Sequence, residues 1–338
     1  MTALLRSASL TSFAEVAAEC GLDAHALVVE AGLPARCLKE PDLKIPAPKV
    51  AHLLEIAAAR AGEPAFALRM VELRRLSNLG PLGLLVREEP TLRSALEAVV
   101  RHLHLHNEAL AVTLEQSGNL VVIRQHLLGE GGQPMRQAAE LALGVMHRVI
   151  AVFMGAGWRP RLVCLTHRAP PALAVHRRIF GDAVEFGHAF NGIVCNAADL
   201  DVPNPGADPV MARYAEQLLA PGAEAGAQVQ QQQQQMLSAR VRQLVVVLLP
   251  RGLCRVEVVA QHLGIDRRTV ARHLAAENTS FSALMNEMRC DLLGRYLKEG
   301  ARSLTEVSAL LGFSAPSAFS RWHRQQFGRA ARVSASVR

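Results

Sequence analysis

One segment near the C-terminal end of the chain, about residues 256–275, limits the possible folds more than any other. It reads as a short apolar helix, a glycine (Gly264), a polar residue (Asp266) and a second helix. Gly264 can adopt the left-handed backbone conformation that ends a helix, and the Asp266 carboxylate can accept hydrogen bonds from the first amides of the next helix. The segment therefore predicts two short helices joined by a tight turn, which is a helix-turn-helix unit.

The same pattern recurs at about residues 303–325. Ser303 and Glu306 have the spacing of a capping box, and Gly312 follows the first glycine by 48 residues. An amphipathic segment from Ser282 to Lys298 predicts a long helix between the two units. Because chance hardly explains such a repetition, the C-terminal part of the chain is predicted to be an all-helical domain.

This part of the chain also carries all of its excess positive charge. Residues 240–338 hold 16 Lys and Arg against 7 Asp and Glu, whereas the preceding residues hold 21 against 23. A basic module binds polyanions because neutralising phosphates releases their counterions. An ordinary basic surface would give the same charge, but in combination with two helix-turn-helix units the charge predicts binding to double-stranded DNA.

The second helix of the first unit is predicted to have one inward and one outward face. Val270 and Leu274 are four residues apart and apolar, so they point toward the core. Arg268 and Arg272 are also four residues apart and share the opposite face. That face is therefore free to enter a major groove.

A low-complexity segment separates this domain from the rest of the chain. Residues 221–236 are rich in Gly and Ala and end in a run of glutamines from Gln230 to Gln235, with little to bury. We therefore expect a first domain at residues 1–220, a Gln-rich linker at 221–236 and the DNA-binding domain at 237–338. Glutamine is a tolerable helix former, so part of the linker can instead extend a neighbouring helix.

The first domain mixes helical and strand patterns. Two β-rich runs around residues 117–119 predict a hairpin over residues 110–127, followed by a long apolar helix at residues 137–155. Short strands are predicted from Arg161 to His167 and within residues 180–187. This is an α+β domain joined to an all-α domain.

The C-terminal domain resembles a known family. The stretch from Leu310 to Gly328, LLGFSAPSAFSRWHRQQFG, follows the signature of the AraC/XylS family of transcription regulators nearly throughout. The resemblance covers residues 240–329 and implies two recognition helices in successive major grooves on one side of the DNA. By position it implies these DNA-contact residues: Arg267, Arg268, Thr269, Ala271, Arg272, Ser317, Ser320, Arg321 and Arg324.

Two positions depart from the family pattern. Arg255 stands where the family usually has a capping Ser or Thr, and the sequence after Gly328 lacks the usual Ser/Thr-Pro step. The last residues are therefore expected to form a basic, frayed tail. Neither departure touches the recognition helices.

The first domain resembles the arabinose-binding-like sensor domain found in one branch of the same family. This resemblance implies a domain that binds a small-molecule effector and forms a homodimer. The segments that carry it are Ala31–Pro34, Lys44–Pro46, Gly80–Gly83, Pro90–Leu96, Phe180–Gly181 and Phe186–Gly187.

Two residues of the predicted hairpin are candidates for the effector site. Arg124 and His126 alternate in the same direction on the predicted hairpin, so they could meet an anionic ligand inside the domain. Alternatively they face solvent or hydrogen-bond a carbonyl of the core.

No catalytic constellation, cofactor site or metal site is predicted. His102, His104 and His106 would align on a strand, but the segment is helical, so surface or partly buried histidines are expected. The six cysteines are widely spaced, which fits reduced thiols in the cytoplasm. No apolar run reaches the length of a membrane span.

The sequence thus predicts a cytoplasmic, one-component transcription regulator, without enzyme activity, that is controlled by an effector. RNA polymerase is an expected partner. Two alternatives remain open at this stage. One is a ligand-independent DNA-binding protein controlled by a protein partner or by its own abundance, and the other is an enzyme fused to a DNA-binding domain.

Overall fold

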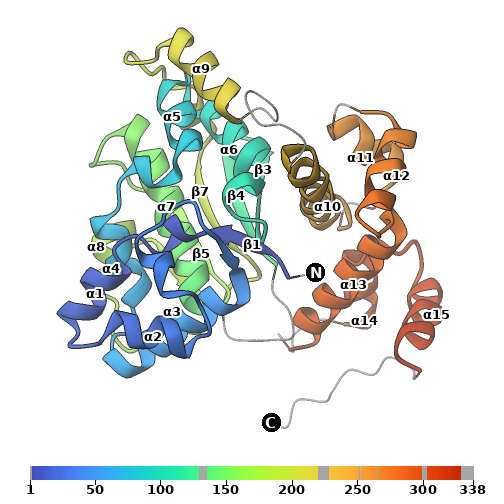
Figure 1. Cartoon of the computed structure of the whole chain (residues 1–338), viewed down its shortest axis with the longest axis horizontal. Helices are drawn as coiled ribbons and strands as arrows, with labels where there is room; N and C mark the ends of the chain where they lie inside the picture. Colours follow the sequence, from blue (N-terminus) through green and yellow to red (C-terminus); the bar gives the residue numbers. More distant parts are fainter. Residues whose placement is uncertain are drawn as a thin grey trace. The chain divides into compact units, whose positions relative to one another are not determined.

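The computed structural model describes residues 2–128, 135–219, 228–250, 252, 254–263, 265–298 and 303–328. They divide into two compact units, one ending at residue 219 and the other beginning at residue 228 in the described part (Figure 1). The first unit is α+β and the second is helical, as the sequence predicts.

The first unit consists of seven strands, nine α-helices and short 3-10 turns in its described part. The strands are β1 (Leu4–Arg6), β2 (Lys44–Pro46), β3 (Leu110–Ser117), β4 (Leu120–Leu127), β5 (Leu162–Leu165), β6 (Val184–Phe186) and β7 (Asn191–Asn196). The helices are α1 (Phe13–Glu19), α2 (Ala24–Glu30), α3 (Ala47–Ala61), α4 (Phe66–Leu73), α5 (Pro81–Glu88), α6 (Leu92–His106), α7 (Arg136–Met154), α8 (Ala174–Phe180) and α9 (Pro209–Leu219).

The main sheet has the order β3-β4-β7-β5-β6, in which only β5 and β6 run parallel. The predicted hairpin is confirmed: Leu110 pairs with Leu127 and Ser117 with Leu120. Gly118 has φ 60°, a conformation that glycine adopts without steric cost in a tight turn. The short predicted strands at residues 161–167 and 180–187 correspond to β5 and β6.

Helix α7 is the central helix of this unit (Figure 1). It packs against α3 and α4 and against strands β4 and β7. Leu143 and Ile150 are completely buried, and Gly144 allows close contact with α4, since a Cβ there would lie 2.6 Å from Val71. By length and composition α7 could cross a membrane, but 56% of its apolar window is buried inside the unit, as in a core helix.

The second unit contains α10 (Gln228–Leu248), α11 (Val256–Leu263), α12 (Arg267–Ala276), α13 (Phe281–Lys298), α14 (Leu304–Leu310) and α15 (Pro316–Phe327). The glutamine run lies within α10, so this part of the expected linker is helical. The remainder of the expected linker, residues 221–227, lies outside the described residues. Helix α10 buries Val241 and Val245 where it packs against α12 and α13.

The predicted helix caps are confirmed where the structure describes them. Asp266 accepts a hydrogen bond from the Thr269 amide at 2.9 Å and begins α12. Ser303 and Glu306 form both bonds of a capping box at the start of α14. Gly312 has φ 70° between α14 and α15. Gly264 lies outside the described residues.

Candidate DNA-binding surface and effector cavity

Helix α12 presents a polar face to solvent. Val270 and Leu274 are completely buried against the rest of the unit, as predicted. Arg268, Ala271 and Arg272 are exposed on the other face. The helix therefore exposes two guanidinium groups one turn apart, with a small alanine between them that leaves room for a base edge.

Two further residues of α12 have local partners. The Thr269 hydroxyl donates a 2.7 Å hydrogen bond to the Asp266 carboxylate, and Arg267 forms a 3.1 Å ion pair with Glu257 of α11. Both side chains of that ion pair are more than half exposed, so water screens their attraction. These contacts hold the start of α12 in place and still allow a phosphate to replace Glu257 as the partner of Arg267.

Helix α15 has the same division into two faces. Phe319, Trp322 and His323 are buried, and the Phe313 ring packs edge-to-face against Phe319 and at a tilt against Trp322. The exposed face carries Ser317, Ser320, Arg321 and Arg324. Two sets of predicted DNA-contact residues thus lie on the exposed faces of two helices of similar length.

Helix α13 fixes the second helix-turn-helix unit through polar contacts. The Trp322 indole donates a 3.2 Å hydrogen bond to Asn286. The Arg289 guanidinium donates a 3.0 Å bond to the Leu311 carbonyl and lies 4.1 Å from the centre of the Phe313 ring. Sequence patterns gave no indication of the role of Arg289, because its partners Leu311 and Phe313 lie in the turn after α14, more than twenty positions away.

The first unit contains a cavity of about 100 Å³. Nineteen of its 24 lining residues are apolar and come from α3, α5, α6, α7, β1, the β3–β4 hairpin and the turns between them. The polar lining residues are Ser9, Arg74, His106, Asn107 and Gln125. Such a combination of apolar walls with a few polar groups is typical of small-molecule sites.

Arg74 and His106 both line this cavity, and Arg74 gives its end a positive charge. Burial lowers the pKa of the Arg74 guanidinium to about 10, so that it remains charged at neutral pH. Burial, with the charges of Arg6, Arg74 and Lys44, lowers the pKa of His106 to about 3, so its imidazole is neutral. Sequence reasoning missed this pair because the two residues are 32 positions apart, Arg74 directly after α4 and His106 at the end of α6.

The structure places Arg124 and His126 on the face of β4 that does not line this cavity. Arg124 forms a 3.2 Å ion pair with Glu115 and lies 4.2 Å from the centre of the Phe190 ring. The His126 imidazole is 3.3 Å from the Thr113 hydroxyl. The neighbouring β4 residue Gln125, which points the opposite way, lines the cavity instead.

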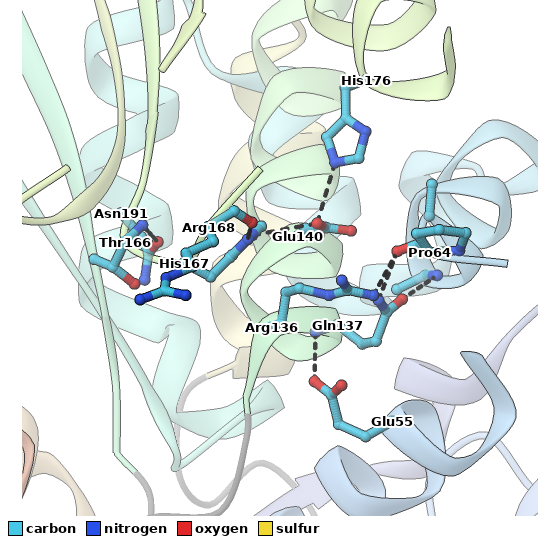
Figure 2. A network of polar contacts seen from close by, with 12 residues as sticks. Glu55, Pro64, Arg136, Gln137, Glu140, Thr166, His167, Arg168, His176 and Asn191 are labelled. Carbon is cyan, nitrogen blue, oxygen red and sulfur yellow. Dashed lines mark hydrogen bonds and ion pairs between the residues drawn. The ribbon is translucent and has the colours of Figure 1, made fainter. Parts of the chain in front are cut away.

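The three histidines considered as metal ligands lie on helix α6, where His104 and His106 are buried. In the described residues no group of three His, Cys, Asp or Glu side chains has the arrangement of a metal site. A different pair of histidines is brought together at α7, where the Nε2 atoms of His167 and His176 lie 3.2 and 3.1 Å from Glu140 Oε1 (Figure 2).

Buried histidines should make the stability of the first unit depend on pH. Burial and the nearby Arg159 and Arg148 lower the pKa of His147 to about 4, and the pKa of His106 is about 3. The unfolded chain, whose histidines have pKa values near 6.5, then binds more protons than the folded chain between about pH 4 and 6.5. Stability is therefore expected to fall as the pH decreases through this window.

This pH dependence can be checked by urea unfolding at several pH values. Replacing His106 or His147 by glutamine should reduce the loss of stability between pH 7 and pH 4.5, whereas replacing the exposed His25 should not. An unchanged pH dependence in both buried variants would contradict the assignment.

Comparison with known proteins identifies both units. Residues 21–204 match the family described as the arabinose-binding domain of AraC transcription regulator, N-terminal. Residues 259–333 match a helix-turn-helix domain family. The first match spans more than half of the chain, and the second covers α12 to α15 with their exposed arginines.

The similar proteins are themselves transcription regulators. The HTH-type transcriptional regulator VirS of Mycobacterium tuberculosis is 29% identical over 331 residues, covering 96% of this chain and 94% of VirS. The ornithine utilization regulator of Pseudomonas aeruginosa is 24% identical, covering 93% and 91%. A crystal structure of the transcriptional regulator CdpR from Pseudomonas aeruginosa aligns with a TM-score of 0.44 at 18% identity, covering 90% and 94%. The protein therefore belongs to the AraC family of DNA-binding transcription regulators, with an arabinose-binding-type domain before its helix-turn-helix domain.

Proposed function

We propose that this AraC-family protein is a sequence-specific transcription regulator whose DNA binding is controlled by a small molecule in the cavity of the first unit. The observation that carries the proposal is the cavity itself, which lies in the domain that is separate from the DNA-binding unit. A ligand shifts such a protein toward the DNA-binding state only if it binds that state more tightly than the other.

In this proposal the exposed faces of α12 and α15 read DNA bases in two major grooves. Arg268, Arg272 and Arg321 can pair with guanine edges, and Ser317 and Ser320 can accept or donate single hydrogen bonds. Arg267, Thr269 and Arg324 lie near the ends of these faces, where phosphates would be their partners. Homodimerisation, contact with RNA polymerase and a cytoplasmic location complete the proposal.

Base reading by Arg272 and Arg321 can be tested by alanine substitution. Each variant is expected to lose about 1 to 3 kcal/mol of binding free energy on the specific site and less on random DNA. Sites would first be located by chromatin immunoprecipitation, and affinities would then be measured on one such site and on a scrambled duplex. Arg60→Ala, which removes an exposed arginine from the first unit, is the matched control.

Equal losses on both duplexes would show that these arginines contact only phosphates. Unchanged affinity on the specific site would place the recognition surface elsewhere.

Control by a partner protein or by abundance is the alternative to control by an effector. The two are separated by measuring the affinity of the purified protein for its site with and without a protein-free metabolite extract. A saturable change in affinity that Ala142→Leu abolishes supports the effector, since Ala142 lines the cavity and a leucine there would fill it. No change supports the alternative.

A further inference from the structure

Arg74 is a buried cation that has no anionic partner among the residues that the structure describes. It follows α4, and the residue is 6% exposed. Its Nε donates to the Thr11 carbonyl at 3.3 Å, and its Nη2 donates to the carbonyls of Ala8 and Ser9. Burial lowers the pKa of Arg74, and among the described residues no carboxylate raises it again. None of its hydrogen bonds to described residues is donated by Nη1. A buried charge that only neutral groups surround is costly, and an anionic ligand would remove much of that cost.

His106 offers a second donor at the same end of the cavity. Its Nδ1 lies 3.4 Å from Nη1 of Arg6. Because an arginine can only donate, Nδ1 must be the acceptor, and the proton of the neutral imidazole is then on Nε2. His106 lines the cavity together with Arg74, so the Nε2–H group can donate to a ligand oxygen.

Other charges near this end leave it electropositive. Lys44 donates a 2.7 Å bond to the Leu105 carbonyl, and burial lowers its pKa. The two nearby acids are already engaged, since Asp42 pairs with Arg6 and Glu108 accepts from the Leu4 amide at 2.9 Å. The charges of three cations, Arg6, Arg74 and Lys44, act on His106, and the carboxylates of Asp42 and Glu108 each have a partner.

Apart from Ser9, Asn107 and Gln125, the remaining walls of the cavity are apolar and disfavour a strongly polar ligand. Val50, Leu54, Val99, Leu141 and Met146 are among its walls. Each hydroxyl of a sugar would need a hydrogen-bond partner here, and an unsatisfied one costs on the order of 1–3 kcal/mol. The family name refers to arabinose, but these walls do not suit a pentose. The volume of about 100 Å³ fits a short chain or a single ring, and Met135 and Met146 can adjust to longer ones.

We propose that the cavity binds an amphipathic monocarboxylic acid, whose carboxylate contacts Arg74 and the His106 imidazole and whose hydrocarbon part lies among the walls formed by α3, α6 and α7. This inference rests on the proposed effector function and specifies the chemical class of the effector. The Arg74 guanidinium would form a charge-assisted bond through Nη1 while keeping its bonds to the backbone.

The test is isothermal titration calorimetry of the full-length protein at pH 7 with butanoate, hexanoate, octanoate and benzoate, each paired with its neutral primary amide. At least one acid should bind with a 1:1 stoichiometry, and its amide should bind roughly tenfold more weakly or not at all, a difference of about 1.4 kcal/mol. Binding of acid and amide with equal affinity, or no binding by any acid, would overturn the proposal.

Variants locate the bound acid. Arg74→Met should weaken binding roughly tenfold or more, and His106→Phe should weaken it several-fold. Because Arg74 also holds the N-terminal segment, Arg74→Lys serves as a second variant that retains the charge, and melting curves must show that each variant is folded. Ala142→Leu should prevent binding without removing a polar group, whereas Arg60→Met should bind like the unchanged protein. Acid binding that survives Ala142→Leu would exclude this cavity.

A failure of the carboxylate assignment can be distinguished from a failure of effector control. If a metabolite extract changes the DNA affinity, and Ala142→Leu abolishes that change, while none of the acids binds, effector control is supported and the carboxylate assignment is wrong. If neither the extract nor the acids have an effect, both are wrong.

Discussion

Replacing Gly312 by alanine is expected to destabilise the second helix-turn-helix unit and to abolish specific DNA binding. Gly312 has φ 70°, a conformation that costs a residue with a Cβ about 1–2 kcal/mol. In addition, a Cβ at this position would lie 2.7 Å from the Leu249 carbonyl oxygen and 2.8 Å from a Leu249 methyl group. Because the nearer atom belongs to the backbone directly after α10, relief requires α14 and α15 to move away from α10.

The measurement is urea unfolding of the full-length protein together with its affinity for a specific site. Gly252→Ala is the matched control, since Gly252 has φ 66° but a Cβ there would meet nothing within 4 Å. The free energy of unfolding of the control should fall only by the cost of a positive φ for alanine, and that of Gly312→Ala should fall clearly more. Equal losses in the two variants would show that the contact with Leu249 contributes little.

The parts of the fold that depend on neighbours in sequence could be predicted. The period of a helix determines which side chains share a face, so Val270 and Leu274 could be predicted to lie inward and Arg268 and Arg272 outward. The cap at Asp266 and the β3–β4 hairpin are also local, because their hydrogen bonds join residues close together in the chain.

The cavity could not be predicted, because its polar groups depend on contacts distant in sequence. Arg74 is held by carbonyls of Ala8, Ser9 and Thr11, more than sixty positions earlier. A strand pattern also shows which residues share a face, but not which face meets a cavity. The sequence singled out Arg124 and His126 because of their charge, whereas the structure places the neighbouring Gln125 in the cavity lining.

The polar network around α7 joins residues of the first unit that are distant from one another in the sequence (Figure 2). Gln137 accepts a 2.9 Å bond from the Ala67 amide and donates a 2.8 Å bond to the Pro64 carbonyl. One turn later, Glu140 is completely buried and its Oε1 contacts both His167 and His176. Because α7 also lines the cavity with residues such as Leu141, these bonds hold one wall of the proposed effector site.

Replacing Glu140 by alanine is therefore expected to destabilise the first unit by about 3 kcal/mol, since it leaves two histidines without their acceptor in an apolar interior. Glu140→Gln retains the volume and one acceptor oxygen and should cost less.

Burial raises the pKa of the Glu140 carboxyl, but the hydrogen bonds from His167 and His176 lower it by more, so the net pKa is below the usual range.

The carboxylate then stabilises the folded state above the pKa that it has in the unfolded chain, and this contribution disappears as the pH falls through the lower, folded-state pKa. Urea unfolding of the unchanged protein and of Glu140→Gln should differ most near pH 7 and converge as the acid range is reached. Glu72→Gln is the control, since Glu72 is partly exposed and its replacement also breaks an ion pair. If this difference in unfolding free energy instead grew as the pH falls, Glu140 would be protonated in the folded protein. Packing, and not the charge of the Glu140 carboxylate, would then hold the two histidines in place.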